Sequence, residues 1–137
     1  MLKRYVLPSL VLLSLTACSN VHCPFQPAGQ VNHVVICWLK DPGNEAQRQQ
    51  IIDRSNDFKK IPGVISVRAG RAIPSTRPVV DSTFDVALVV TFKDEAAMRA
   101  YDRNPIHVKA VNEVLKPLAG KLVIYDIDTD SSAARKK

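Results

Sequence analysis

The sequence is short of the features that mark several protein classes. Its 137 residues include five glycines, three cysteines and 6% aromatic residues. So few glycines exclude a collagen-like chain, and 46% hydrophobic with 23% charged residues is typical of a globular domain. No apolar run reaches the roughly 20 residues that a membrane-spanning helix needs. The length fits one domain, since domains cluster at about 100–150 residues.

Motifs of several enzyme and metal classes are also missing. The chain has no Gly-rich phosphate loop, no Ser-His-Asp order and no nucleophile elbow. No Cys-x-x-Cys or Cys/His spacing indicates zinc. Asp126, Asp128 and Asp130 alternate near the C-terminus without the glycine and glutamate of a calcium-binding loop, so they predict a solvated strand end. We therefore expect neither a metal nor a cofactor.

The net charge of +6 belongs mostly to the two ends of the chain. Lys3 and Arg4 lie near the N-terminus and residues 135–137 are all basic, so the remainder carries only +1. A nucleic-acid-binding face needs a basic stripe, which the body of the chain lacks. We expect no nucleic-acid partner.

The N-terminus carries an export signal. Lys3 and Arg4 precede an apolar stretch over residues 6–15, which ends in Leu15-Thr16-Ala17-Cys18. This tetrapeptide resembles a bacterial lipobox, which implies a signal peptide over residues 1–17 and lipidation of Cys18. The alternative is an ordinary secretory signal in which the cysteine occurs by chance.

Lipidation would fix the location of the protein. Several acyl chains on Cys18 satisfy the requirement for stable membrane anchoring. Ser19 in second place favours the outer membrane of the bacterial cell envelope, facing the periplasm, because retention in the inner membrane usually goes with aspartate. Residues 18–30 then form a lipidated tether, with two prolines and a glycine and no helical period.

Two cysteines remain once Cys18 is lipidated. Cys23 lies in the tether and Cys37 in an apolar stretch. An oxidising compartment permits a Cys23–Cys37 disulfide. The alternative is a buried Cys37 and a free, exposed Cys23.

Apolar patterns predict the elements of one domain over residues 31–128. The predicted strands are residues 31–39, 64–69, 84–92 and 122–127, and the predicted helices are residues 45–60 after the N-cap Asn44, 95–101 after Asp94, and 106–115. Residues 70–82 contain two prolines and predict a loop. Three arginines flank this loop: Arg68, Arg71 and Arg77. We expect them to face either solvent or an anionic ligand. Residues 129–137 predict a polar basic tail.

The order of these elements predicts an α+β fold. A β-α-β-β-α(α)-β chain is ferredoxin-like, with four antiparallel strands and helices on one face. The strand at 84–92 carries Phe84, Val86 and Leu88 on one face and Ala87 and Val89 on the other. Because it and the first strand are apolar on both faces, each face must be covered. The helices cover only one, so we expect sheet-on-sheet homodimerisation.

Three polar aromatic residues are candidates for chemistry. His33 lies on the first strand, Tyr101 at the end of a helix and His107 at the start of the next. Histidine suits proton transfer because its pKa of about 6.5 lies near working pH. Two interpretations stay open: a small-molecule cleft with catalytic His107, Tyr101 and His33, or packing residues with satisfied hydrogen bonds.

Short stretches in the right order resemble the stress-responsive A/B barrel (Dabb) domain family. They are His33-Val34-Val35, Ile61-Pro62-Gly63-Val64, the stretch 85–90, the stretch 101–107 and Val123-Ile124-Tyr125-Asp126. The resemblance implies a ferredoxin-like subunit that pairs into a dimeric α/β barrel. A plant polyketide cyclase of this family uses the tyrosine and last histidine of Tyr-x-x-His-Pro-x-His, which Tyr101 and His107 match. Asn104 departs from that pattern, so cyclase activity does not follow.

Three hypotheses for function follow. The first is a membrane-anchored lipoprotein that binds a small hydrophobic or aromatic molecule, in connection with stress. The second is a cofactor-independent enzyme, a lyase/cyclase or a monooxygenase-like oxygenase, with His107 as proton acceptor, Tyr101 holding a carbonyl and His33 orienting the substrate. The third is a non-catalytic structural dimer.

Overall fold

The computed structural model describes residues 29–129. The predicted signal peptide, Cys18, Cys23, most of the predicted tether and most of the predicted tail lie outside the described residues. The elements are β1 (Val31–Leu39), α1 (Glu45–Asn56), a 3₁₀ turn (Asp57–Lys60), β2 (Val64–Gly70), β3 (Val86–Phe92), α2 (Glu95–Asp102), α3 (Pro105–Ala110), a π-helical turn (Val111–Leu115), α4 (Lys116–Leu118) and β4 (Ala119–Asp128). None of the helices within this described range is long and apolar enough to cross a membrane.

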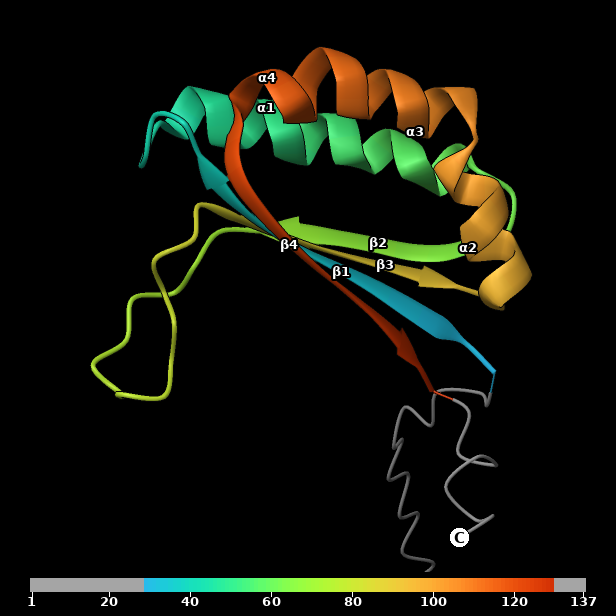
Figure 1. Cartoon of the computed structure of the whole chain (residues 1–137), viewed down its shortest axis with the longest axis horizontal. Helices are drawn as coiled ribbons and strands as arrows, with labels where there is room; N and C mark the ends of the chain where they lie inside the picture. The colour runs from blue at the N-terminus through green and yellow to red at the C-terminus, as the bar shows by residue number, and fades with distance from the viewer. Residues whose placement is uncertain (1–28, 130–137) are drawn as a thin grey trace, which may run out of the picture.

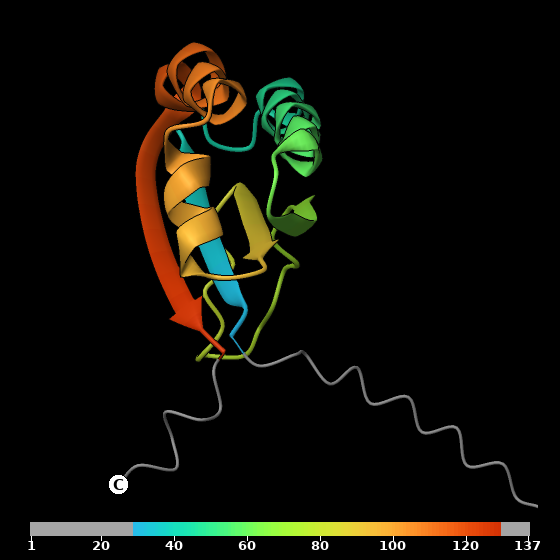
Figure 2. The same ribbon diagram turned by 90° about the vertical axis from the view of Figure 1, so that its right-hand side faces the viewer.

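The strands form one antiparallel sheet in the order β2-β3-β1-β4. The helices lie together on one face of it, as Figures 1 and 2 show. This confirms the predicted ferredoxin-like α+β fold. β1 and β3 occupy the two central positions, which is why both strands are apolar on both faces.

The side chains of β1 alternate strictly between the two faces of the sheet. Val31, His33, Val35, Cys37 and Leu39 are buried, while the residues between them are half-buried. The buried set packs beneath the helices together with the helix-facing residues of β3. His33 therefore faces the helices, a question that alternation in the sequence left open.

The opposite face of the sheet, called the outer face below, has no helix over it among residues 29–129 (Figure 1). The pairing register places Val34 between Val89 and Tyr125, and Ile36 between Ala87 and Val123. All four of these partners are apolar or aromatic. Tyr125 is more than half exposed. The outer face thus presents an uncovered apolar surface of the kind that marks an interaction site.

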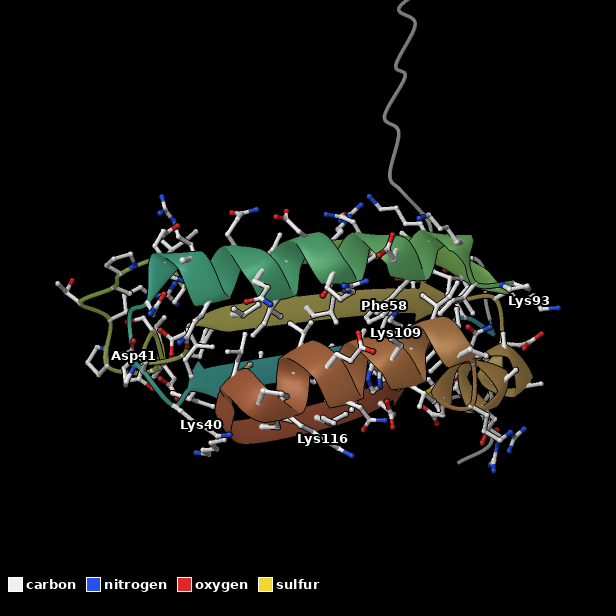
Figure 3. The ribbon with its side chains drawn as sticks, turned by 90° about the horizontal axis from the view of Figure 1, so that it is seen from above. Lys40, Asp41, Phe58, Lys93, Lys109 and Lys116 are labelled. Carbon is white, nitrogen blue, oxygen red and sulfur yellow. The ribbon has the colours of Figure 1, made fainter. Side chains whose placement is uncertain are left out.

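The helices α1, α2 and α3 each follow a residue whose side chain caps them. Asn44, Asp94 and Asn104 accept hydrogen bonds from the backbone N–H groups of Gln47, Ala97 and Ile106, respectively. Such caps satisfy N–H groups that have no partner within the helix. Seen from above the helices, α1 and the α3–α4 run lie side by side over the sheet, with Phe58 between them (Figure 3).

The start of β3 differs from the prediction. The strand begins at Val86 rather than at residue 84, because the buried Asp85 carboxylate accepts hydrogen bonds from the N–H groups of Leu39 and Gly43, each 2.8 Å away. Phe84 does not share the face of Val86 as expected. Its ring lies edge-on to that of Trp38, which alternation places on the outer face.

The last helix and strand also have other bounds than predicted. The helical run continues through a π-helical turn to Leu118, and β4 starts at Ala119 rather than at residue 122. Gly120 was expected to precede the strand but lies within it. A Cβ on Gly120 would come within 3.3 Å of the carbonyl oxygen of Leu39. This glycine therefore permits close approach of two backbones rather than ending an element.

Gly63 generates a prediction about stability. Its φ is +87°, and a Cβ there would lie 2.5 Å from the Cβ of Ala97. Gly63→Ala combines left-handed strain, about 1–2 kcal/mol, with this steric overlap. Gly43→Ala is the matched control, because Gly43 has φ +78° and open space around it. Urea unfolding should show a larger loss of unfolding free energy for Gly63→Ala, and equal losses in the two variants would contradict the packing argument.

Candidate functional site

A cavity of about 230 Å³ lies between the sheet and the helices. Most of its wall is apolar and comes from both layers, including Val35 and Leu88 from the sheet and Ile51 and Val114 from the helical layer. An apolar cavity of about 150 Å³ already accepts a benzene ring in another protein. The space is therefore large enough for a small ring compound.

Tyr101 forms one wall of this cavity. It lies in the last turn of α2 and is 1% exposed. Its ring packs edge-on against Phe92, with the centroids 4.9 Å apart, and against Phe58 at 5.4 Å. Burial, with a smaller contribution from the charge of Asp102, raises the pKa of the Tyr101 phenol well above its usual value. The hydroxyl stays protonated at neutral pH and is a hydrogen-bond donor.

His107 lies against Tyr101 on the adjacent helix α3. The two ring centroids are 4.1 Å apart and the ring planes differ by 33°. His107 Nδ1 lies 3.3 Å from the carbonyl oxygen of Asp102. Because a carbonyl oxygen only accepts, Nδ1 carries the proton of the neutral ring and Nε2 keeps its lone pair. Burial lowers the pKa of His107, against the opposing influence of Asp102, so the ring is neutral at neutral pH.

His33 enters the same cavity from the sheet. Its ring centroid lies 6.0 Å from that of Tyr101, and its Nδ1 lies 2.6 Å from Oδ1 of Asp126. Register explains this contact, since His33 on β1 pairs directly with Asp126 on β4. Because a carboxylate oxygen only accepts, Nδ1 of His33 is the donor in this contact.

The structure brings the three predicted site residues together. His33, Tyr101 and His107 come from a strand and two helices and all line one cavity. Asp126, expected at a solvated strand end, keeps about half of its side chain exposed and also contacts His33. Only the register of β1 and β4 reveals this contact, and one sequence does not show that register. Asn104, where the chain departs from the family pattern, caps α3.

The packing interpretation also finds support in these contacts. Tyr101 is a central core residue, and His107 makes the backbone hydrogen bond expected of a residue at a helix start. Geometry alone thus assigns the three side chains to a cavity and not to a reaction.

Cys37 lines the cavity as a free thiol that is 2% exposed. Burial, with a smaller contribution from Asp85, raises its pKa to about 11, so the thiol is protonated and unreactive at neutral pH. Its possible disulfide partner, Cys23, lies outside the described residues. Within residues 29–129, no group of three or more His, Cys, Asp or Glu side chains is arranged to hold a metal ion.

The polar groups of the cavity are few and chemically complementary. Tyr101 offers a neutral O–H donor and His107 a neutral imidazole whose Nε2 can accept, while His33 adds a ring whose Nδ1 is bonded to Asp126. Arg54 and Asp102 add one cationic and one anionic side chain to the lining. The arrangement can hold an apolar ring, donate a hydrogen bond to an oxygen on that ring, and accept a proton from it.

Several solved structures are similar to this chain at low sequence identity. A Dabb family protein with a ferredoxin-like fold from Mesorhizobium loti is 24% identical with a TM-score of 0.60, over 72% of this chain and 95% of that one. A dimeric ferredoxin-like protein of unknown function from Thermobifida fusca is 20% identical with a TM-score of 0.60, over 74% and 92%. A hydroxynitrile lyase from Passiflora edulis is 22% identical with a TM-score of 0.62, over 77% and 97%. These likenesses establish the fold.

The family itself follows from the sequence. No curated protein is similar enough in sequence to match the chain. The family model for the Stress responsive A/B Barrel Domain, however, matches residues 31–129, which include every strand and helix of the described structure. The chain therefore belongs to the stress-responsive A/B barrel (Dabb) family.

Proposed function

We propose that this protein is a lipid-anchored envelope protein whose domain forms a homodimer and binds a small hydrophobic or aromatic molecule. The observation that carries the binding function is the apolar cavity of about 230 Å³. A core that its own side chains filled completely would favour a purely structural role. The interior of this domain instead keeps a space in which polar groups converge.

The chemistry of the lining supports a mostly apolar ligand with one oxygen function. Transfer of an apolar ring from water into such a cavity is favourable by about 25 cal/mol per Å² of buried surface. The Tyr101 hydroxyl, which burial keeps protonated, is a donor for a carbonyl or hydroxyl oxygen. His33 is held in one orientation by Asp126, which favours a fixed pose of the ligand.

A second candidate function is cofactor-independent proton transfer. The observation in its favour is the stacking of His107 on Tyr101, with a centroid distance of 4.1 Å. In this proposal, Nε2 of His107 accepts a proton from the substrate, Tyr101 donates a hydrogen bond to the substrate carbonyl, and the His33–Asp126 pair orients it. The similar fold of a hydroxynitrile lyase is an analogy for such an enzyme and assigns no substrate.

Homodimerisation is supported by the outer face. Val34, Ile36 and their partners on β3 and β4 form an apolar surface over which no helix of residues 29–129 lies. A second sheet packed at the usual spacing of about 10 Å would cover both copies at once. Similar proteins from Thermobifida fusca and Bacteroides fragilis are described as dimeric.

Ligand binding is testable with acetophenone, a ring that carries one carbonyl. Ala110 is buried in the cavity wall, so Ala110→Leu should fill part of the space and weaken binding at least tenfold by isothermal titration calorimetry. The control is Ala100→Leu, on the exposed side of α2, which should bind as the wild type does. Equal binding by both variants would remove the cavity as the site.

The pKa of His107 predicts a pH dependence of stability. Because burial lowers this pKa in the folded chain below the ordinary value of about 6.5, the unfolded chain binds more protons between the two values. The unfolding free energy should therefore be undiminished above about pH 6.5 and fall as the pH drops toward the lowered value. His107→Gln should remove this loss, and NMR titration of the His107 ring should show a midpoint below 6.5. Parallel stability curves for both proteins would contradict the shift.

Lipid anchoring is testable in a bacterial host. Metabolic labelling with an alkyne palmitate should label the wild type and leave Cys18→Ser unlabelled and absent from the membrane fraction. Cys23→Ser, five residues further on, is the matched control and should keep both the label and the membrane location. Label on Cys18→Ser would disprove lipidation at Cys18.

A further inference from the structure

The loop that joins β2 to β3, residues 71–85, exposes two aliphatic side chains. Ile73 is 82% exposed and Val79 is 84% exposed, more than the other large apolar residues among the described ones. The loop has neither helix nor strand and extends away from the sheet (Figure 1). Two such side chains on one projecting segment are candidates for burial against a partner.

Local interactions hold the loop in shape. Pro74 and Pro78 restrict the backbone, and the N–H of Val80 donates to the carbonyl of Arg77 over 3.0 Å. The N–H of Arg77 donates to Ser75 Oγ. A segment restricted in this way loses little conformational entropy when it binds.

The C-terminal end of the loop contacts the outer face. Trp38 Nε1 donates to Thr83 Oγ1 over 2.9 Å, and the Phe84 ring packs edge-on against Trp38. Lys121 Nζ lies over the Trp38 ring at 4.3 Å. The apolar surface of the outer face therefore continues, through Trp38 and Phe84, to the C-terminal end of the loop.

The direction of the loop points to a second copy of the chain. It leaves the sheet on the side away from α1 and α3 (Figures 1 and 2). Paired sheets lie about 10 Å apart, while half of this loop, at about 3.1 Å per extended residue, reaches roughly 20 Å. With a second sheet against the outer face, the loop is therefore long enough to reach along the flank of the other copy.

We propose that the loop of each copy clasps the other copy, with Ile73 and Val79 buried against it. This inference rests on the homodimer of the proposed function and names the segment that secures it. A membrane surface is the competing occupant, since Arg71 and Arg77 are exposed and would suit anionic lipids. The second copy is favoured because the loop and the outer face are continuous and a single partner covers both.

The test measures the dimer dissociation constant by analytical ultracentrifugation on the full chain carrying Cys18→Ser, which removes the predicted lipid. The double variant Ile73→Asp with Val79→Asp should raise the constant at least tenfold, with an unchanged circular dichroism spectrum. The milder double variant Ile73→Ser with Val79→Ser should also raise the dimer dissociation constant. The matched control, Val108→Asp, changes a 41% exposed aliphatic residue on α3 and should leave it unchanged.

The variants distinguish failure of the proposed loop contact from failure of the dimer itself. Val89→Arg, in the middle of the outer face, should abolish dimerisation, and a monomeric wild type would overturn both proposals. A dimeric wild type whose constant the loop variants leave within twofold would overturn the clasp alone. Loss of co-sedimentation with phosphatidylglycerol vesicles in those variants, at an unchanged dimer constant, would instead assign the loop to a membrane surface and overturn the clasp.

Discussion

The packing of Tyr101 between the sheet and the helices is the contact on which the candidate site depends. Its ring meets Phe92 from β3, Phe58 after α1, His107 from α3 and His33 from β1. Two strands and two helical segments thus converge on one side chain. The burial that stabilises this contact also keeps the phenol protonated and His107 neutral, so packing and site chemistry have one cause.

The two faces of the sheet differ because, among the described residues, the helices cover only one of them. On the covered face, the helices and β1 leave a cavity with polar groups on its wall. On the outer face, the same two central strands present apolar side chains without a cover among the described residues. The proposed ligand site and the proposed dimer surface are therefore the two sides of one sheet, and side chains that alternate along β1 contribute to both.

Local signals predicted most of the elements, since caps and apolar periodicity act over a few residues. Asn44 and Asp94 begin the helices that they were expected to begin, and the strand at 31–39 has the predicted bounds. The errors have non-local causes. Phe84 turns to the outer face because Asp85 binds the N–H groups of Leu39 and Gly43, more than forty residues away in sequence. Gly120 stays in its strand because the chain at Leu39 passes close to it.

The sequence by itself determined the fold class, the family and the trio His33, Tyr101 and His107, because residue order and short-range patterns carry that information. Only the tertiary structure decided that His33 faces the helices, that Asp126 holds it, and that all three residues line one cavity. These facts depend on strand register and on the packing of helices against the sheet. Shifting a strand by one residue would turn its side chains to the other face, and no pattern within a single strand records that choice.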